Sequence, residues 1–159
     1  MGIGLAPGGK EEMAHFYYGH QSAITNLSPE VKTVLEGCVI RDKVLWHLWR
    51  DGIDALAENN QEKWEAYKNA ADKIGQYAIA PCLTAGNTEL VQSIALTTQW
   101  VTQAVSDDDF IRKMFERIEA NIVDIGNHVA CMKTSWDDSE FEQAGYCYGQ
   151  LNLIVFGSV

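Results

Sequence analysis

Basic residues are scarce in this chain of 159 residues, which has 12 Lys and Arg against 22 Asp and Glu and a net charge of −10. No run of Lys or Arg is longer than a dipeptide. Binding to a nucleic-acid backbone or to an anionic membrane surface depends on clustered positive charge. The composition therefore predicts no nucleic-acid partner and no attachment to anionic lipid.

Long apolar runs are also missing. The longest uninterrupted one, residues 153–156, is far shorter than the roughly 20 residues of a membrane-spanning helix, so we expect no membrane span. The opening letters MGIGLAPGGK have neither the basic start nor the apolar centre of a secretory signal. The sequence is thus expected to be either a cytosolic protein or the mature part of a secreted one.

Motifs of catalysis and cofactor binding are absent: there is no G-x-S-x-G, no H-E-x-x-H and no phosphate-binding glycine loop. We therefore expect no enzyme and no cofactor. Glu12 with His15, and Asp124 with His128, each provide only half of a metal site. The acidic run 107–109 lacks the spaced ligands of a calcium loop and is typical of a helix start, so no metal is predicted.

Helical periodicity dominates what the sequence does contain. Apolar residues recur at spacings of three and four, and no window alternates with period two. A helix over residues 10–24 looks short or broken at Gly19, Ser28 can cap a helix that starts at Pro29, and Asn87 can cap the helix that follows it. The clearest stripe runs without interruption from Phe110 to Met132. We predict an all-α fold: a single-domain bundle of five to six helices over residues 10–159, preceded by a flexible or extended arm, residues 1–9.

Four cysteines stand far apart with no C-x-x-C pair, which disfavours zinc and thioredoxin-type sites. They could be buried free thiols or two disulfides in any of three connectivities. A hairpin turning near residues 135–139 would bring Cys131 and Cys147 to a similar height on antiparallel helices, which is bridgeable if the faces agree. By exclusion Cys38 would then pair with Cys82.

The last helix, residues 140–156, carries Gly145 and Gly149 four apart on one face. Each glycine weakens a helix by about 0.8–1 kcal/mol, so a closely approaching backbone must compensate. The partner is either a helix of the same chain, with the last helix central in the bundle, or another subunit. For assembly between subunits, the predicted contact residues are Ile3, Leu5, Gly145, Gly149, Leu151, Ile154 and Phe156.

Two further features have ordinary and functional interpretations. Five tryptophans and six tyrosines either pack the core or line a hydrophobic cavity. Asn26 begins an N-L-S glycosylation sequon that Pro29 follows directly.

Five short segments follow one another along the chain: GC at 37–38, DGIDAL at 51–56, APC at 80–82, NIVDIGNH at 121–128 and DSEFEQAGYCYGQLNLIVF at 138–156. This order resembles a family of small, secreted, helical proteins of ciliates. The resemblance implies an extracellular setting, an oxidised Cys38–Cys82 pair and no catalytic residues. Cys131 and Cys147 lie outside that family pattern.

Taken together, the sequence predicts a secreted, non-enzymatic, disulfide-supported protein that self-assembles into a homo-oligomer or an extracellular fibre. The alternative is a carrier that holds a small apolar ligand in an aromatic-lined cavity between its helices.

Overall fold

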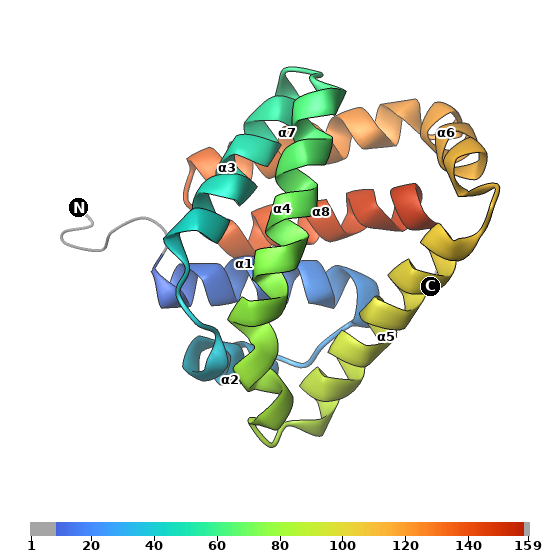
Figure 1. The fold of residues 1–159 in the computed structure, drawn as a ribbon. Coiled ribbons are helices and arrows are strands. Elements are labelled where there is room, and N and C mark those ends of the chain that lie inside the picture. Colours follow the sequence, from blue (N-terminus) through green and yellow to red (C-terminus); the bar gives the residue numbers. More distant parts are fainter. Residues whose placement is uncertain (1–8, 158–159) are drawn as a thin grey trace.

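The computed structural model describes residues 9–157, and within this range the chain contains helices and no strand. The predicted all-α class is confirmed. The described residues form eight α-helices and one 3-10 helix, more than the five to six predicted (Figure 1). In chain order the elements are α1 (Lys10–Thr25), α2 (Glu30–Cys38), α3 (Lys43–Ala57), α4 (Gln61–Ile79), the 3-10 helix η1 (Ala80–Thr84), α5 (Thr88–Ser106), α6 (Phe110–Ala120), α7 (Ile122–Asp137) and α8 (Phe141–Phe156).

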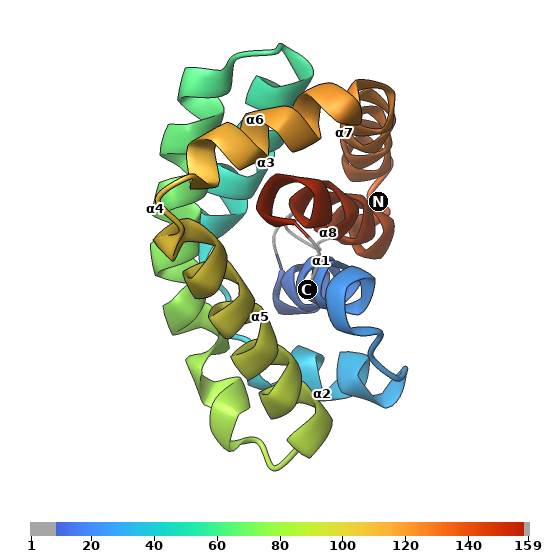
Figure 2. The ribbon, with the colours of Figure 1, turned by 90° about the vertical axis from the view of Figure 1, so that its right-hand side faces the viewer.

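Helices α1 and α8 lie side by side at the centre, with the other helices around them (Figures 1 and 2). Glycines allow this contact. A Cβ on Gly145 would overlap the backbone carbonyl of Phe16, and one on Gly149 would lie 2.6 Å from the Ala23 Cβ and from the His20 carbonyl oxygen. The final helix is therefore central in the fold, which is one of the two arrangements that the sequence left open.

This packing corrects one prediction. Helix α1 is continuous through Gly19 and is not broken there; Gly19 is the point at which the backbone of Glu142 approaches. Gly145, Gly149 and Leu151, named above for assembly, are buried within the single chain. Ile3 and Leu5 lie outside the described residues.

The predicted stripe from Phe110 to Met132 is not one helix. It divides at Asn121, whose side-chain amide donates a hydrogen bond to the Arg117 carbonyl 2.7 Å away. An asparagine that bonds the preceding turn offers the backbone an alternative to helix continuation. The break allows α7 to run along α8 while α6 crosses the end of α8 (Figure 2).

Capping was predicted with mixed success. Asn87 caps α5 as expected, with its Oδ1 accepting from the Leu90 backbone N–H at 2.8 Å. Ser28 does not cap α2, because its hydroxyl donates to Glu89 on α5 instead, and Pro29 occupies the cap position. The helix begins at Glu30, one residue after the predicted start at Pro29.

Two disulfides tie the helices together. Cys38 at the end of α2 is bonded to Cys82 in η1, with Cα atoms 5.0 Å apart. Cys131 on α7 is bonded to Cys147 on α8, with Cα atoms 6.2 Å apart. This is the pairing expected from a hairpin of the last two helices, and all four cysteines are paired.

A cluster of aromatic rings fills the centre between α1, α3, α7 and α8. The Trp46 and Trp136 rings have centroids 4.4 Å apart, and Phe16 contacts both Trp49 and Trp136. Core packing is therefore the correct interpretation for Trp46 and Trp136, which are buried.

None of the helices in residues 9–157 is both long enough and apolar enough to cross a bilayer.

Candidate ligand-binding cavity

A cavity of about 310 Å³ lies between α4 and α5, with α1 and α8 behind it. The two walls diverge from η1, where α4 ends and α5 begins, and they form a V in front of the central helices (Figure 1). The Cys38–Cys82 disulfide fixes the apex of this V to α2. Pockets that hold small molecules begin at about this volume.

One end of the cavity is apolar. The wall there is formed by Met13 on α1, Val39 in the connection between α2 and α3, and Leu45 on α3. Ala78 and Ile79, in the last turn of α4, complete it. The backbone hydrogen bond from Ile40 to the Ala78 carbonyl, 2.8 Å long, closes this end. Met13, Val39, Leu45 and Ala78 are at most 3% exposed and only back this wall. The apolar surface that a ligand could cover, at a gain of roughly 25 cal/mol per Å², belongs to the partly exposed lining residues Tyr17, Trp49, Ile79, Val101 and Phe156.

Charged groups line the cavity at α4. The Lys68 ammonium lies 2.8 Å from a carboxylate oxygen of Asp72 and 5.1 Å from the centre of the Phe156 ring. The Lys68 side chain is 15% exposed, whereas that of Asp72 is 56% exposed. Burial alone would lower the pKa of Lys68, but Tyr148 and Asp72 outweigh it and the pKa is raised, so the amine stays charged.

A chain of hydrogen bonds crosses the floor of the cavity from α8 to α5. The amide of Asn152 and the Nε2 atom of His20 are 2.9 Å apart, and so are the Nδ1 atom of His20 and the Oε1 atom of Gln21. Because an amide oxygen can only accept, Nδ1 carries the proton and Nε2 accepts from Asn152. The Gln21 amide continues the chain by donating to Ser93 and Thr97.

Burial sets the protonation states along this floor. It lowers the pKa of His20 to about 4, against a weaker opposing effect of the bond to Gln21. Burial likewise raises the pKa of Tyr148, whose ring centroid lies 5.2 Å from that of His20. Near neutral pH the cavity therefore presents a neutral imidazole, an intact phenol and a cationic amine.

The Oδ1 atom of Asn152 is enclosed and has no hydrogen-bond partner in the described part of the chain. Asn152 also lines the cavity. Buried polar atoms are nearly always paired in folded proteins. Because the atom is enclosed by protein, this unpaired acceptor lies behind the accessible surface of the cavity.

The far end of the cavity is held by contacts to the end of α8. Trp100 on α5 packs edge-on against Phe156 and donates its indole N–H to the Gly157 carbonyl. Arg117 on α6 donates to the carbonyls of Ile154 and Val155, at 2.8 and 2.7 Å. These bonds satisfy the last carbonyls of α8 and hold Phe156 beside Lys68.

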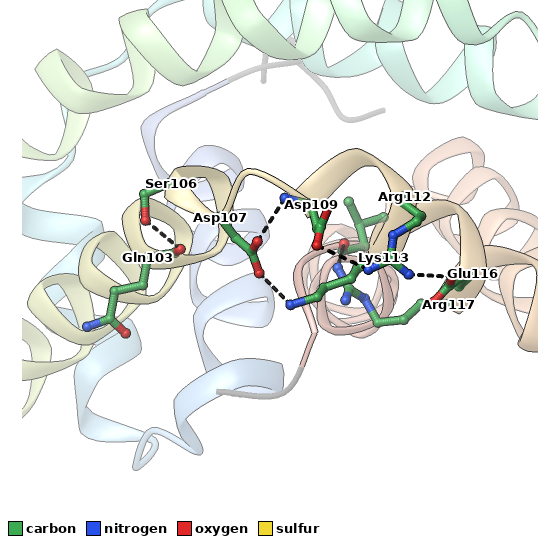
Figure 3. Close-up of polar contacts among 9 residues, drawn as sticks. Gln103, Ser106, Asp107, Asp109, Arg112, Lys113, Glu116 and Arg117 are labelled. Atoms are coloured by element: carbon green, nitrogen blue, oxygen red, sulfur yellow. Dashed lines mark hydrogen bonds and ion pairs between the residues drawn. The ribbon is translucent and has the colours of Figure 1, made fainter.

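The acidic run 107–109 forms the turn that orients α6 (Figure 3). Asp107 accepts from the Asp109 backbone N–H and pairs with Lys113, and Asp109 pairs with Arg112. The carboxylates of Asp107 and Asp109 thus hold the turn together through these contacts. Asp109 makes no side-chain cap to α6. Figure 3 also places Arg117 one turn beyond Lys113 on the same helix.

Potential metal ligands converge at one place in residues 9–157. His15 lies 3.1 Å from Glu36 and 4.0 Å from Glu11. The two half-sites noted in the sequence, Glu12 with His15 and Asp124 with His128, were not expected to bind a metal, and the group of His15, Glu11 and Glu36 was not foreseen. The contact between His15 and Glu36 ties α1 to α2.

Sequence reasoning found part of the cavity wall. Trp49 and Trp100 line the cavity as the ligand interpretation of the tryptophans proposed, while Trp46 and Trp136 belong to the core. Lys68 was missed, because a lysine four residues before an aspartate is typical of any exposed helix. Asn152 did leave a signal, since it is a polar residue within an otherwise apolar helix.

No protein-family model, curated protein or solved structure matches this chain.

Proposed function

We propose that this protein binds and carries a small apolar molecule in the cavity between α4 and α5. The observation that carries the proposal is the cavity itself: about 310 Å³, apolar at one end and lined at the other by a few convergent polar groups. That combination is typical of small-molecule sites. A chain optimised only for stability would close such a space, because each unfilled cavity costs free energy of folding.

Burial of the last helix supports this choice over assembly. Gly145, Gly149 and Leu151 were expected either to meet another subunit or to lie at the centre; the two glycines contact α1 within the chain, and Leu151 is buried. Helix α8 instead supplies Tyr148, Asn152 and Phe156 to the cavity.

Gly75 offers a sharp test of the cavity. It lies on α4 at helical spacing from Lys68, Ala71 and Ala78, lines the cavity, and has open space where a Cβ would stand. Gly75→Phe should therefore occupy the cavity without colliding with the backbone. Gly126→Phe on α7 is the matched control, since Gly126 also has open space and lies away from the cavity.

The experiment titrates each variant with the neutral fluorescent probe N-phenylnaphthylamine. We expect a saturable one-to-one enhancement for the wild type and Gly126→Phe, and roughly tenfold weaker binding or more for Gly75→Phe. Equal binding by all three proteins, or none by the wild type, would reject the cavity as the site. Circular dichroism and thermal unfolding establish that both variants are folded.

The setting that we propose is extracellular. Two disulfides are typical of secreted proteins and rare in reducing compartments. Asn26 supports the same setting, because its sequon lies in the exposed connection between α1 and α2, where an oligosaccharide would have room.

Self-assembly is the second candidate, and an exposed apolar strip on α6 and α7 favours it. The side chains of this strip are between 49% and 72% exposed and comprise Ile111, Phe115, Ile122 and Val123. Sedimentation velocity tests the idea: assembly that disappears in Val123→Lys places the interface on this strip. Assembly that disappears only on deletion of residues 2–9 places it on the predicted arm, and a monomer at all concentrations excludes self-assembly.

A further inference from the structure

The polar end of the cavity has the chemistry of a carboxylate-binding site. Lys68 provides the one cation among the described cavity-lining residues, and Asp72 the one carboxylate. An ammonium group has three N–H donors, and Asp72 is the one hydrogen-bond acceptor that the described chain gives it. Lys68 therefore retains donors for a guest.

Tyr148 supplies a second donor, since it lines the same cavity as Lys68. Burial raises the pKa of Tyr148, so its hydroxyl stays protonated and can donate at neutral pH. A carboxylate has two oxygens that accept hydrogen bonds, which suits a cavity lined by an ammonium and a phenol. His20 adds no positive charge here, because burial keeps it neutral.

We propose, on the basis of the carrier function above, that the ligand is an amphipathic carboxylic acid of the fatty-acid class. Its carboxylate binds Lys68 and the Tyr148 hydroxyl, and its hydrocarbon tail lies along the partly exposed apolar lining, which comprises Tyr17, Trp49, Ile79 and Val101. Without ligand, the exposed Asp72 carboxylate pairs with the Lys68 ammonium, and the carboxylate of the bound acid replaces it.

A neutral alcohol is the main competitor, because its hydroxyl could donate to the orphaned Oδ1 of Asn152. That atom is enclosed by protein, so a guest reaches it only if side chains move. The Lys68 amine, in contrast, belongs to a side chain that is 15% exposed at the cavity wall. Accessibility together with charge favours the acid.

The test measures by calorimetry the binding of dodecanoic acid, dodecanol and methyl dodecanoate, which share one chain and differ in headgroup. The wild type should prefer the acid by roughly tenfold or more. Lys68→Met removes the charge while keeping an unbranched apolar side chain, and it should remove that preference without abolishing binding of the alcohol. Lys73→Met, an exposed position on the same helix, is the control and should behave as the wild type.

Two further variants sharpen the outcome. Asp72→Asn should strengthen binding of the acid, because Lys68 loses its competing partner, and Tyr148→Phe should weaken the acid more than the ester. Equal affinity for acid and alcohol, or a preference for the alcohol that Asn152→Leu removes, would overturn the carboxylate assignment and leave the carrier function standing. Failure of all three compounds and of the neutral probe would overturn both.

Discussion

The carbonyl oxygen of Phe16 faces Gly145 so closely that a single added methyl group would overlap it. This relationship couples the first described helix to the last one. It also fixes the floor of the cavity, since α1 carries Phe16 and His20 and α8 carries Tyr148 and Asn152.

Gly145→Ala should therefore destabilise the protein, although alanine is the better helix former. Separating two packed helices to admit a methyl group costs about 1–3 kcal/mol, which exceeds the gain of about 1 kcal/mol in helix propensity. Chemical denaturation measures the effect. Gly37→Ala, where a Cβ meets nothing within 4 Å, is the control and should be neutral or slightly stabilising. Equal stabilisation of both variants would contradict the close contact.

The two disulfides should differ in their effect on the cavity. Cys38–Cys82 closes a longer loop than Cys131–Cys147, with separations of 44 and 16 residues. Chain entropy then gives stabilisations of about 4 and about 3 kcal/mol. Paired Cys→Ser variants should both lower the melting temperature, whereas only loss of Cys38–Cys82 should weaken probe binding, because it frees the apex between α4 and α5. Similar affinities in both variants would show that this disulfide does not hold the cavity open.

His20 should make stability depend on pH. Its pKa is about 4 in the fold and near 6.5 without the environment of the fold, so between these values the unfolded chain binds a proton that the folded chain does not. The free energy of unfolding should therefore fall as the pH drops from 6.5 to 4, by about 3 kcal/mol, and stay reduced below that. Lys68 and Asp72 are the charged groups that act on this histidine.

Denaturation of the wild type, His20→Gln and His47→Gln at several pH values isolates this contribution. His20→Gln should lose the component between pH 6.5 and 4, and His47→Gln, at an exposed position, should retain it. The same pH profile in all three proteins would mean that His20 is protonated normally in the fold.

Much of the helical pattern could be predicted, because caps and breakers act locally: Asn87 and Pro81 mark boundaries that the structure keeps. The break at Asn121 could not, since the apolar spacing continues through it and only the path around α8 requires a turn. Gly19 was misjudged for a related reason, because a glycine weakens an isolated helix but here admits a neighbouring backbone. A cavity lined by aromatic residues was one of the two expectations, but its position could not be predicted because α1, α4, α5 and α8 each contribute only a few residues to it.

Asn26 should carry an N-linked glycan when the chain is expressed through a eukaryotic secretory pathway. The residue is exposed and follows the last turn of α1, although Pro29 directly after the sequon lowers the efficiency that we expect. Gel mobility before and after glycosidase treatment, compared with Asn26→Gln, measures occupancy. A wild-type protein that is secreted and folded but unaffected by glycosidase would remove this support for an extracellular role.

The tryptophans allow the most direct test of a ligand between α4 and α5. Trp49 and Trp100 line the cavity, whereas Trp136 lies in the core against Phe141, and each gives its own indole N–H signal in a nitrogen-15 spectrum. On saturation with N-phenylnaphthylamine, we expect the Trp49 and Trp100 signals to shift most and the Trp136 signal to move little. Large shifts at Trp136 with unchanged Trp49 and Trp100, or no shift at any tryptophan, would contradict the proposed cavity.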